Sequence, residues 1–251
     1  MKKISYILIL IITSFSCSTE GTVDCFEAAG TIIEQEFETP RFKKIIVWDY
    51  VQLYIKQGEN RSVIVETGEN LLNEISVTVT DDVLEIKNGN TCNLVRDYGI
   101  TKVYVTTPEL TEITNSSGLT VISEGLINFT ELKLISEDPD GLGEYSYNGD
   151  FRMENLDINK LSIAANGLSN FYLKGRASSF SINAFDSDVR VEAGELEVSL
   201  LYVYHRSTNK IIVNPQISIT GEIRGLGDII SKNQPPLVNV EEYYTGKLIF
   251  E

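Results

Sequence analysis

Five short triplets of the type apolar-polar-apolar recur in the second half of the chain. They are Leu161-Ser162-Ile163, Phe180-Ser181-Ile182, Val198-Ser199-Leu200, Ile217-Ser218-Ile219 and Val238-Asn239-Val240. Their first residues lie 19, 18, 19 and 21 residues apart. Alternation of this kind indicates a short strand with one buried face. A near-constant period of about 20 residues predicts stacked coils, because each coil can bury its apolar face only against its neighbours.

A second apolar element follows most of these triplets after a polar corner. These elements are Phe171-Tyr172-Leu173, Val189-Arg190-Val191, Ile211-Ile212-Val213 and Leu248-Ile249-Phe250, and Leu119-Thr120-Val121 is an earlier element of the same kind. Leu132-Lys133-Leu134 begins the series, after which a longer gap leads to Leu161. We therefore expect residues 109–251 to form a right-handed parallel β-helix or a similar solenoid of short strands. A β-sandwich stays open as the alternative, because turns also recur at the closer spacing of that fold.

The preceding segment, residues 37–108, shows longer alternating strands. Val51, Leu53 and Ile55 alternate with polar residues and lead into the turn Gly58-Glu59-Asn60, and Asp81-Asp82 separates two further alternating runs. This pattern is typical of strands joined by tight turns. We expect an N-terminal β-hairpin region that belongs to the same all-β head domain and caps one end of the stack.

The N-terminus has the pattern of an export signal. Lys2 and Lys3 precede the mostly apolar run 4–12, which is about half the length that a membrane span needs. Small residues lead to Cys17, so we expect residues 1–16 to be removed and Cys17 to be lipidated. Residues 17–36 would then be a lipid-anchored tether, with acyl chains holding the protein at the membrane. Plain secretory cleavage and a retained anchor helix are the alternatives.

Composition excludes several classes of function. The 251 residues contain 36 Asp and Glu against 21 Lys and Arg, a net charge of −15, which argues against nucleic acid as the partner. One histidine and three cysteines are too few for a multi-histidine or cysteine-rich metal site, and no phosphate-binding loop is present. We expect no cofactor. Two cysteines, Cys25 and Cys92, remain after Cys17 and favour a disulfide in an exported protein, with two separate thiols as the alternative.

The first half of the chain resembles a known family, the putative auto-transporter adhesin, head GIN domain family of Bacteroidota lipoproteins. The resemblance lies in the segments 42–47, 51–58, 63–72, 84–88, 91–93 and 103–110 and in the position of Cys25. It covers about residues 24–120. Where family members often show Gly-Ser-Gly at the first corner, this chain has Ser116-Ser117-Gly118. The resemblance implies a β-helix-like adhesin head on an envelope lipoprotein and supplies no catalytic residues.

Three local pairs of tyrosines are candidates for a binding surface, because tyrosine joins apolar area to a polar tip. They are Tyr145 and Tyr147, Tyr202 and Tyr204, and Tyr243 and Tyr244. The alternative is that these are ordinary strand residues, half of which point inward.

For three further groups of residues we prefer a structural role to a catalytic or metal-binding one. His205 is interpreted as a corner residue rather than a catalytic base, and Asp138-Pro139-Asp140-Gly141 as a solvated turn rather than a calcium loop. Asp157, Asp186, Asp188 and Glu192 fall on neighbouring rungs, where paired acids could cleave a polysaccharide. Adjacency by chance is the simpler explanation in so acidic a chain.

We therefore expect a non-catalytic, adhesin-like binding head that is exported and held at the outer membrane, facing either the cell surface or the periplasm. Its ligand would be a protein or a glycan. The alternatives are a glycan-binding or polysaccharide-cleaving β-helix protein and a periplasmic structural or sensing lipoprotein.

Overall fold

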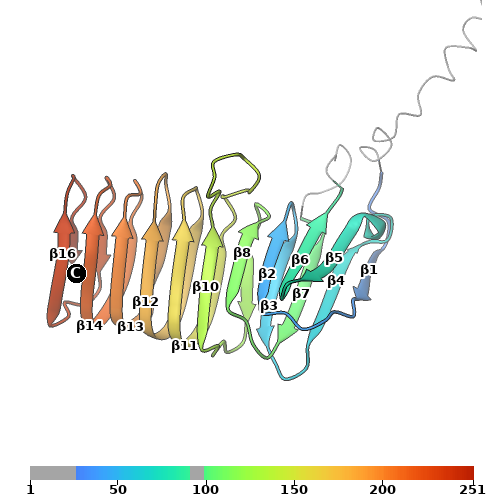
Figure 1. Cartoon of the computed structure of the whole chain (residues 1–251), viewed down its shortest axis with the longest axis horizontal. Helices are drawn as coiled ribbons and strands as arrows, with labels where there is room; N and C mark the ends of the chain where they lie inside the picture. The colour runs from blue at the N-terminus through green and yellow to red at the C-terminus, as the bar shows by residue number, and fades with distance from the viewer. Residues whose placement is uncertain (1–26, 91–98) are drawn as a thin grey trace, which may run out of the picture.

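The computed structural model describes residues 27–90 and 99–251, and these residues form strands and one 3₁₀ turn at Leu72–Glu74. The strands of the N-terminal half are β1 (Ile32–Glu36), β2 (Lys44–Trp48), β3 (Gln52–Gln57), β4 (Ser62–Gly68), β5 (Ile75–Thr80), β6 (Val83–Asn88), β7 (Lys102–Thr107), β8 (Glu112–Ser116) and β9 (Val121–Glu124). Those of the C-terminal half are β10 (Glu131–Ser136), β11 (Phe151–Ala165), β12 (Asn170–Ala184), β13 (Arg190–His205), β14 (Ile211–Ile223), β15 (Ile229–Ser231), β16 (Leu237–Glu242) and β17 (Leu248–Phe250). The strands stack along one axis, which confirms the all-β class and the solenoid-like stack (Figure 1). The right-handed sense of the coil stays a prediction.

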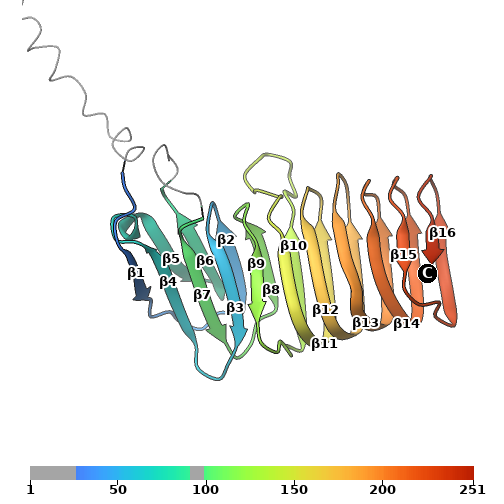
Figure 2. The same ribbon diagram turned by 180° about the vertical axis from the view of Figure 1, so that it is seen from behind.

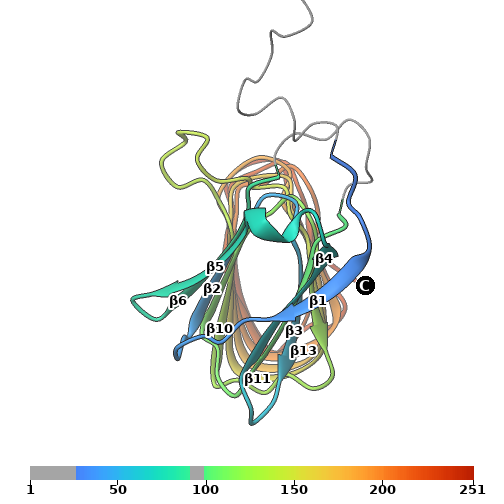
Figure 3. The same cartoon turned by 90° about the vertical axis from the view of Figure 1, so that its right-hand side faces the viewer.

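The solenoid has two faces. The β10 face consists of β5, β6, β2, β8, β10, the C-terminal halves of β11 to β14, and β16, in that spatial order. The β9 face consists of β1, β4, β7, β3, β9, the N-terminal halves of β11 to β14, β15 and β17. Figure 2 shows the stack from behind, and Figure 3 shows along its axis how the two faces close into a flattened ring.

Four long strands, β11 to β14, each cover both faces. Their pairing shifts register where they turn the corner, between Met153 and Leu156 in β11 and between Tyr172 and Lys174 in β12. Such irregularities bend a strand because they add a residue on one side of a pair. Gly175 lies at this bend with φ +122°, and a Cβ there would approach the Leu156 carbonyl oxygen to 2.1 Å. Only glycine fits this position without displacing the neighbouring backbone.

The core consists of rows of inward side chains, each row contributed by successive rungs. One row on the β9 face contains Val121, Phe151, Phe171, Val191, Ile211 and Ile229, all fully buried. Burying a side chain of this size stabilises the fold by about 1.5–3 kcal/mol. Since this row joins successive rungs from β9 to β15, the repeat seen in the sequence is the period of the core.

The register of two triplets differs from the expectation. The structure pairs Leu161 with Phe180, Phe180 with Leu201, Leu201 with Ile219 and Ile219 with Val238, so the steps are 19, 21, 18 and 19 residues. Leu200 and Ile217, which the expected triplets placed in the core, are 50% and 53% exposed. Register shifts in β13 between Glu192 and Glu197 and between Val198 and Leu200 displace the true inward positions along the chain.

The N-terminal region is more interleaved than a set of hairpins. β5 and β6 do form the expected hairpin around Asp81 and Asp82, whose φ values of 51° and 64° suit a two-residue turn. The expected hairpin of β3 with β4 is absent, because β7 lies between them and pairs with both. The rung made by β2 and β3 is inserted between the rung of β6 and β7 and the rung of β8 and β9. Local alternation identifies the strands but carries no information on this spatial order.

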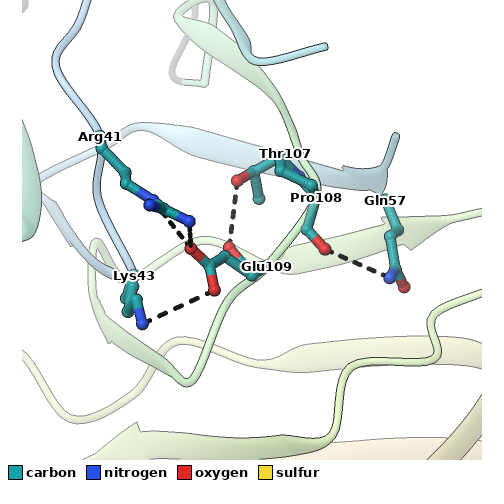
Figure 4. A network of polar contacts seen from close by, with 6 residues as sticks. All are labelled: Arg41, Lys43, Gln57, Thr107, Pro108 and Glu109. Atoms are coloured by element: carbon teal, nitrogen blue, oxygen red, sulfur yellow. Dashed lines mark hydrogen bonds and ion pairs between the residues drawn. The ribbon is translucent and has the colours of Figure 1, made fainter. Parts of the chain in front are cut away.

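A polar network fastens the inserted rung (Figure 4). The Arg41 guanidinium lies 2.6 Å from the Glu109 carboxylate, and Lys43 lies 3.6 Å from the other Glu109 oxygen. Gln57 donates a hydrogen bond to the Pro108 carbonyl at 3.4 Å, and Thr107 donates one to the Glu109 carbonyl at 3.0 Å. The Arg41 guanidinium lowers the pKa of Glu109 through this hydrogen-bonded pair. The bend after β7 is thus tied to both ends of the β2–β3 segment.

The two ends of the stack differ. Antiparallel β1 and the β5–β6 hairpin lie at the N-terminal end (Figure 3). At the other end, β16 and β17 run parallel to their neighbours β14 and β15. Within residues 27–90 and 99–251, no helix is long and apolar enough to span a membrane. The signal peptide (1–16), Cys17, Cys25 and Cys92 lie outside the described residues, so lipidation and the disulfide stay predictions.

Candidate binding trough on one face of the solenoid

One row of outward side chains runs across the strands of the β10 face. In register order it contains Lys44, Glu112, Lys133, Ser162, Ser181, Tyr202, Thr220 and Asn239. Ser162 and Ser181 are the middle residues of two of the triplets that predicted the fold. They point outward because the residues on either side of them point into the core. Small side chains at the centre of the row and larger ones at its ends leave a depression along it.

This depression consists of two recesses of about 320 and 340 Å³ that share Lys160 and Ser162. We name the pair "the trough". Its principal lining residues are Lys44, Glu112, Glu131, Lys133, Lys160, Ser162, Ser179, Ser181, Leu200, Tyr202, Ser218 and Thr220. Since these residues come from seven strands, β2, β8 and β10 to β14, the trough runs along the axis of the solenoid and across the strand direction.

The two ends of the trough differ in chemistry. At the β2 end, Lys44 lies 3.4 Å from Glu112, while Lys133 and Lys160 form no ion pair within the described residues. At the β14 end, Leu200 and Tyr202 are 50% and 43% exposed. Three lysines and two glutamates line the β2 end, so its net charge is +1 in a chain whose net charge is −15. The serine hydroxyls between these ends can both donate and accept hydrogen bonds.

A second recess, of about 630 Å³, lies on the β9 face. There the Arg152 guanidinium stacks over the Tyr172 ring at 4.7 Å. The other cations that line it are already paired, Lys174 with Glu195 and Lys232 with Glu251. Among the described residues, this recess therefore has one cation without an ion pair, Arg152, whereas the trough has two, Lys133 and Lys160.

The six tyrosines predicted as a binding surface do not form one patch. Tyr202 lines the trough, and Tyr204 lies further along the same strand, with its ring 6.0 Å from that of Phe185. Tyr145 packs against Trp48 with ring centroids 4.9 Å apart, and Tyr147 lies in the same loop, which projects between β10 and β11 in Figure 1.

Tyr243 and Tyr244 follow β16 at the C-terminal end of the stack and are 53% and 60% exposed. Arg224 stacks on the Tyr243 ring at 4.1 Å, and a hydrogen bond to Glu241 raises the pKa of Tyr243. Of the predicted set, the structure therefore places Tyr202 in the lining of the trough and the other five tyrosines outside it.

His205 is fully buried at the end of β13, in a row with Ala184 and Ile223. Neither ring nitrogen makes a hydrogen bond to the described part of the chain, and burial lowers the pKa of His205 to about 4. A buried imidazole without a nucleophile at hydrogen-bonding distance has the surroundings of a core residue. This placement agrees with its interpretation as a corner residue.

The acidic residues weighed for cleavage chemistry lie on different parts of the rungs. Asp157 is at the corner between the faces, paired in register with Arg176, and Glu192 is ion-paired with Arg190 on the β9 face. Asp188 lies in the turn before β13, where its carboxylate accepts a 2.7 Å hydrogen bond from the Thr208 hydroxyl. Asp138 caps its own turn by accepting a 2.7 Å hydrogen bond from the Gly143 N–H. Among the described residues, no group of three or more His, Cys, Asp or Glu side chains is placed to hold a metal.

The lysines of the trough were not predicted from the sequence. Lys133 is the middle residue of the triplet Leu132-Lys133-Leu134, so alternation alone places it on the outer face. Only the structure shows that Lys160, which lies opposite Glu131 on the neighbouring strand, lines the same recess. Trp48 was also missed. Its indole N–H donates a 2.9 Å hydrogen bond to Glu85, and its ring contacts Tyr145 from a loop about a hundred residues later.

A family model described as the putative auto-transporter adhesin, head GIN domain, matches residues 41–235. The chain belongs to this family. The match confirms the resemblance seen in the first half of the sequence and extends it through the repeats of this GIN-domain protein. No curated protein matches the chain.

Solved structures share the fold at low sequence identity. A putative adhesin from Bacteroides fragilis is 20% identical with a TM-score of 0.76, and the match covers 88% of this chain and 97% of that one. A putative adhesin from Parabacteroides merdae is 16% identical with a TM-score of 0.60 over the same shares. A structure from Parabacteroides distasonis described as a putative lipid binding protein is 14% identical, with a TM-score of 0.59 and again these shares. At these identities the likeness shows the fold alone.

Proposed function

We propose that this GIN-domain protein is a non-catalytic binding head that is anchored to the cell envelope and exposed on the cell surface. The observation that carries the proposal is the trough, an open depression that crosses seven strands and presents lysines, hydroxyls and an exposed tyrosine. Membership of an adhesin family supports the same role. The mechanism is contact at many points along a rigid rod, so that modest individual contacts add up along one ligand.

The anchoring half of the proposal rests on the sequence of the N-terminus. Removal of residues 1–16 and lipidation of Cys17 would attach the chain at the end of the solenoid where β1 lies, since β1 is the first described strand (Figure 1). A Cys17→Ser variant would then leave the membrane fraction and appear in the soluble envelope fraction. Retention of that variant in the membrane would contradict lipid anchoring.

Protease shaving of intact cells tests the surface location. Cells that express the full chain are treated with a protease, and the protein is followed by immunoblot beside a periplasmic control protein. We expect the head to be digested while the control stays intact. Protection until the outer membrane is opened would contradict a surface adhesin and support the alternative, a periplasmic structural or sensing lipoprotein.

Adhesion itself is tested by attachment of cells with and without the protein to surfaces coated with glycans or with matrix proteins. We expect the expressing cells to attach to at least one coating more than tenfold better than the cells without the protein. Equal attachment on every coating would count against the binding role.

A further inference from the structure

We propose that the trough binds an acidic linear polysaccharide in which charged sugars alternate with neutral ones. The inference rests on the proposed binding function and goes further by naming the ligand class. It follows from four properties of the trough: its direction across the strands, the pairing of its backbone hydrogen-bonding groups, the hydroxyl side chains along it, and the spacing of its charges.

The direction of the trough requires an extended ligand. Neighbouring strands lie about 4.8 Å apart, so the three steps from Lys133 on β10 to Tyr202 on β13 span about 14 Å. A ligand that reaches both residues must be a chain, and it meets one new outward side chain at each strand step. A small metabolite would occupy only one of the two recesses.

The backbone N–H and C=O groups of the trough strands are already hydrogen-bonded within the solenoid. On this face β10, β11, β12, β13 and β14 each pair with a strand on both sides. A peptide therefore cannot add as an extra strand there, which is a common way for proteins to bind an extended peptide. Recognition must come from side chains alone.

The side chains between the ends are hydroxyls that retain hydrogen-bonding capacity. Ser179 donates to the Asn159 carbonyl at 3.2 Å and Ser181 accepts from Asn183 at 3.3 Å. Each hydroxyl has one donor and two acceptor positions, so both keep positions for a ligand. A ligand rich in hydroxyls satisfies such a floor, and Tyr202 adds an amphipathic ring beside it.

The charges set the spacing of acidic groups on the ligand. Lys133 and Lys160 form no ion pair in the described chain, although Glu112 and Glu131 lie opposite them in register. The row from Ser162 to Thr220 carries no charged side chain. A polymer with an anion on every unit, such as a nucleic acid, would place charges over this uncharged floor in a strongly acidic protein. One acidic sugar at the lysines, followed by neutral sugar over the serines, matches the arrangement.

Hyaluronan is a suitable probe, because it alternates one uronic acid with one neutral sugar. Binding of fluorescent hyaluronan fragments to the detergent-purified full chain is measured by anisotropy at 0.15 M salt, with dextran as the neutral comparison. We expect hyaluronan to bind, dextran to bind at least tenfold more weakly, and the double variant Lys133→Gln/Lys160→Gln to lose at least tenfold in hyaluronan affinity. The matched control Lys56→Gln/Lys210→Gln removes the same charge from exposed sites outside the trough and should bind as the wild type does.

Two results would overturn the inference. One is hyaluronan affinity that is equal in the two double variants while both unfold as the wild type does. The other is no hyaluronan binding together with binding of polyglutamate or of anionic phospholipid vesicles, which would assign the trough to an acidic peptide or a membrane surface. Either result leaves surface exposure intact, since shaving tests that separately, and protection from shaving would leave the polysaccharide measurement valid.

Discussion

The rings of Phe151 and Phe171 lie nearly parallel in the core, with centroids 5.0 Å apart and an interplanar angle of 8°. They occupy the same inward position on successive rungs, so each ring covers the face of the next. This contact is the clearest case of how one rung shields its neighbour from water.

Replacing Phe171 by alanine should destabilise the chain by about 3–5 kcal/mol, because the change removes a fully buried ring and leaves a cavity. Urea unfolding followed by circular dichroism measures the effect. Phe185→Ala is the control, since Phe185 is 40% exposed and should cost less than about 1 kcal/mol. Equal losses in the two variants would contradict the role of the inward rows.

Gly175→Ala should destabilise by at least about 3 kcal/mol, because the new Cβ meets the Leu156 carbonyl oxygen and the residue must keep a positive φ. Gly125→Ala offers the comparison. Gly125 has φ +72° and no atom within 4 Å of the added carbon, so it pays only the conformational cost of about 1–2 kcal/mol. If both variants lose the same amount, then the bend adapts and the close approach is not required.

Asn115→Ala should cost about 2–4 kcal/mol, because the buried amide makes four hydrogen bonds that no other group replaces. Its Nδ2 donates to the Leu119 and Asp150 carbonyls at 2.8 and 3.0 Å, and its Oδ1 accepts from the Ser117 N–H and hydroxyl. Thermal and urea unfolding report the loss. Asn128→Ala, at an exposed asparagine, should change stability by less than about 0.5 kcal/mol, and a comparable loss there would show a general effect of amide removal instead.

Stability should fall in acid through His205. Burial lowers the folded pKa of His205 to about 4 from 6.5, and the nearby Asp228 carboxylate offsets part of that effect. As the pH falls below 6.5 the unfolded chain binds a proton that the folded chain does not, so the histidine disfavours folding progressively down to about pH 4.

The measurement is the free energy of unfolding at pH 7 and pH 4.5 for the wild type and His205→Leu. Carboxylates elsewhere titrate in both proteins and cancel in the difference. We expect the wild type to lose roughly 2–3 kcal/mol more than the variant over this range. The same pH dependence in both would show that the folded chain accommodates the charged imidazole.

The sequence was sufficient to predict the repeat but not the exact register of every rung. The period of the triplets predicts a solenoid because inward residues must recur once per coil. The register failed at the third and fourth triplets, where Leu201 and Ile219 take the places expected for Val198 and Ile217. The shifts in β13 cause this displacement and leave no separate mark in the alternation.

The candidate site was predictable only in part. Tyr202 was predicted as an exposed residue from its place in a tyrosine pair, and it lines the trough. The presence of Lys133 and Lys160 in one recess became recognisable only through the pairing of β10 with β11, across a gap that includes the projecting loop. Likewise, the contact of Trp48 with Tyr145 depends on tertiary position, which alternation within a strand does not encode.

The inserted rung of β2 and β3 bears on the order in which the chain acquires its structure. β2 requires β6 on one side and β8 on the other, so the rung of β2 and β3 cannot be completed until about residue 124 has been synthesised. Growth by simple addition from the N-terminus is therefore impossible in this half, whereas residues 151–251 can add rung upon rung. We expect pulsed hydrogen exchange during refolding to show protection in β12 and β13 before β2. The N-terminal strands would then gain stable structure after strands that follow them in the sequence.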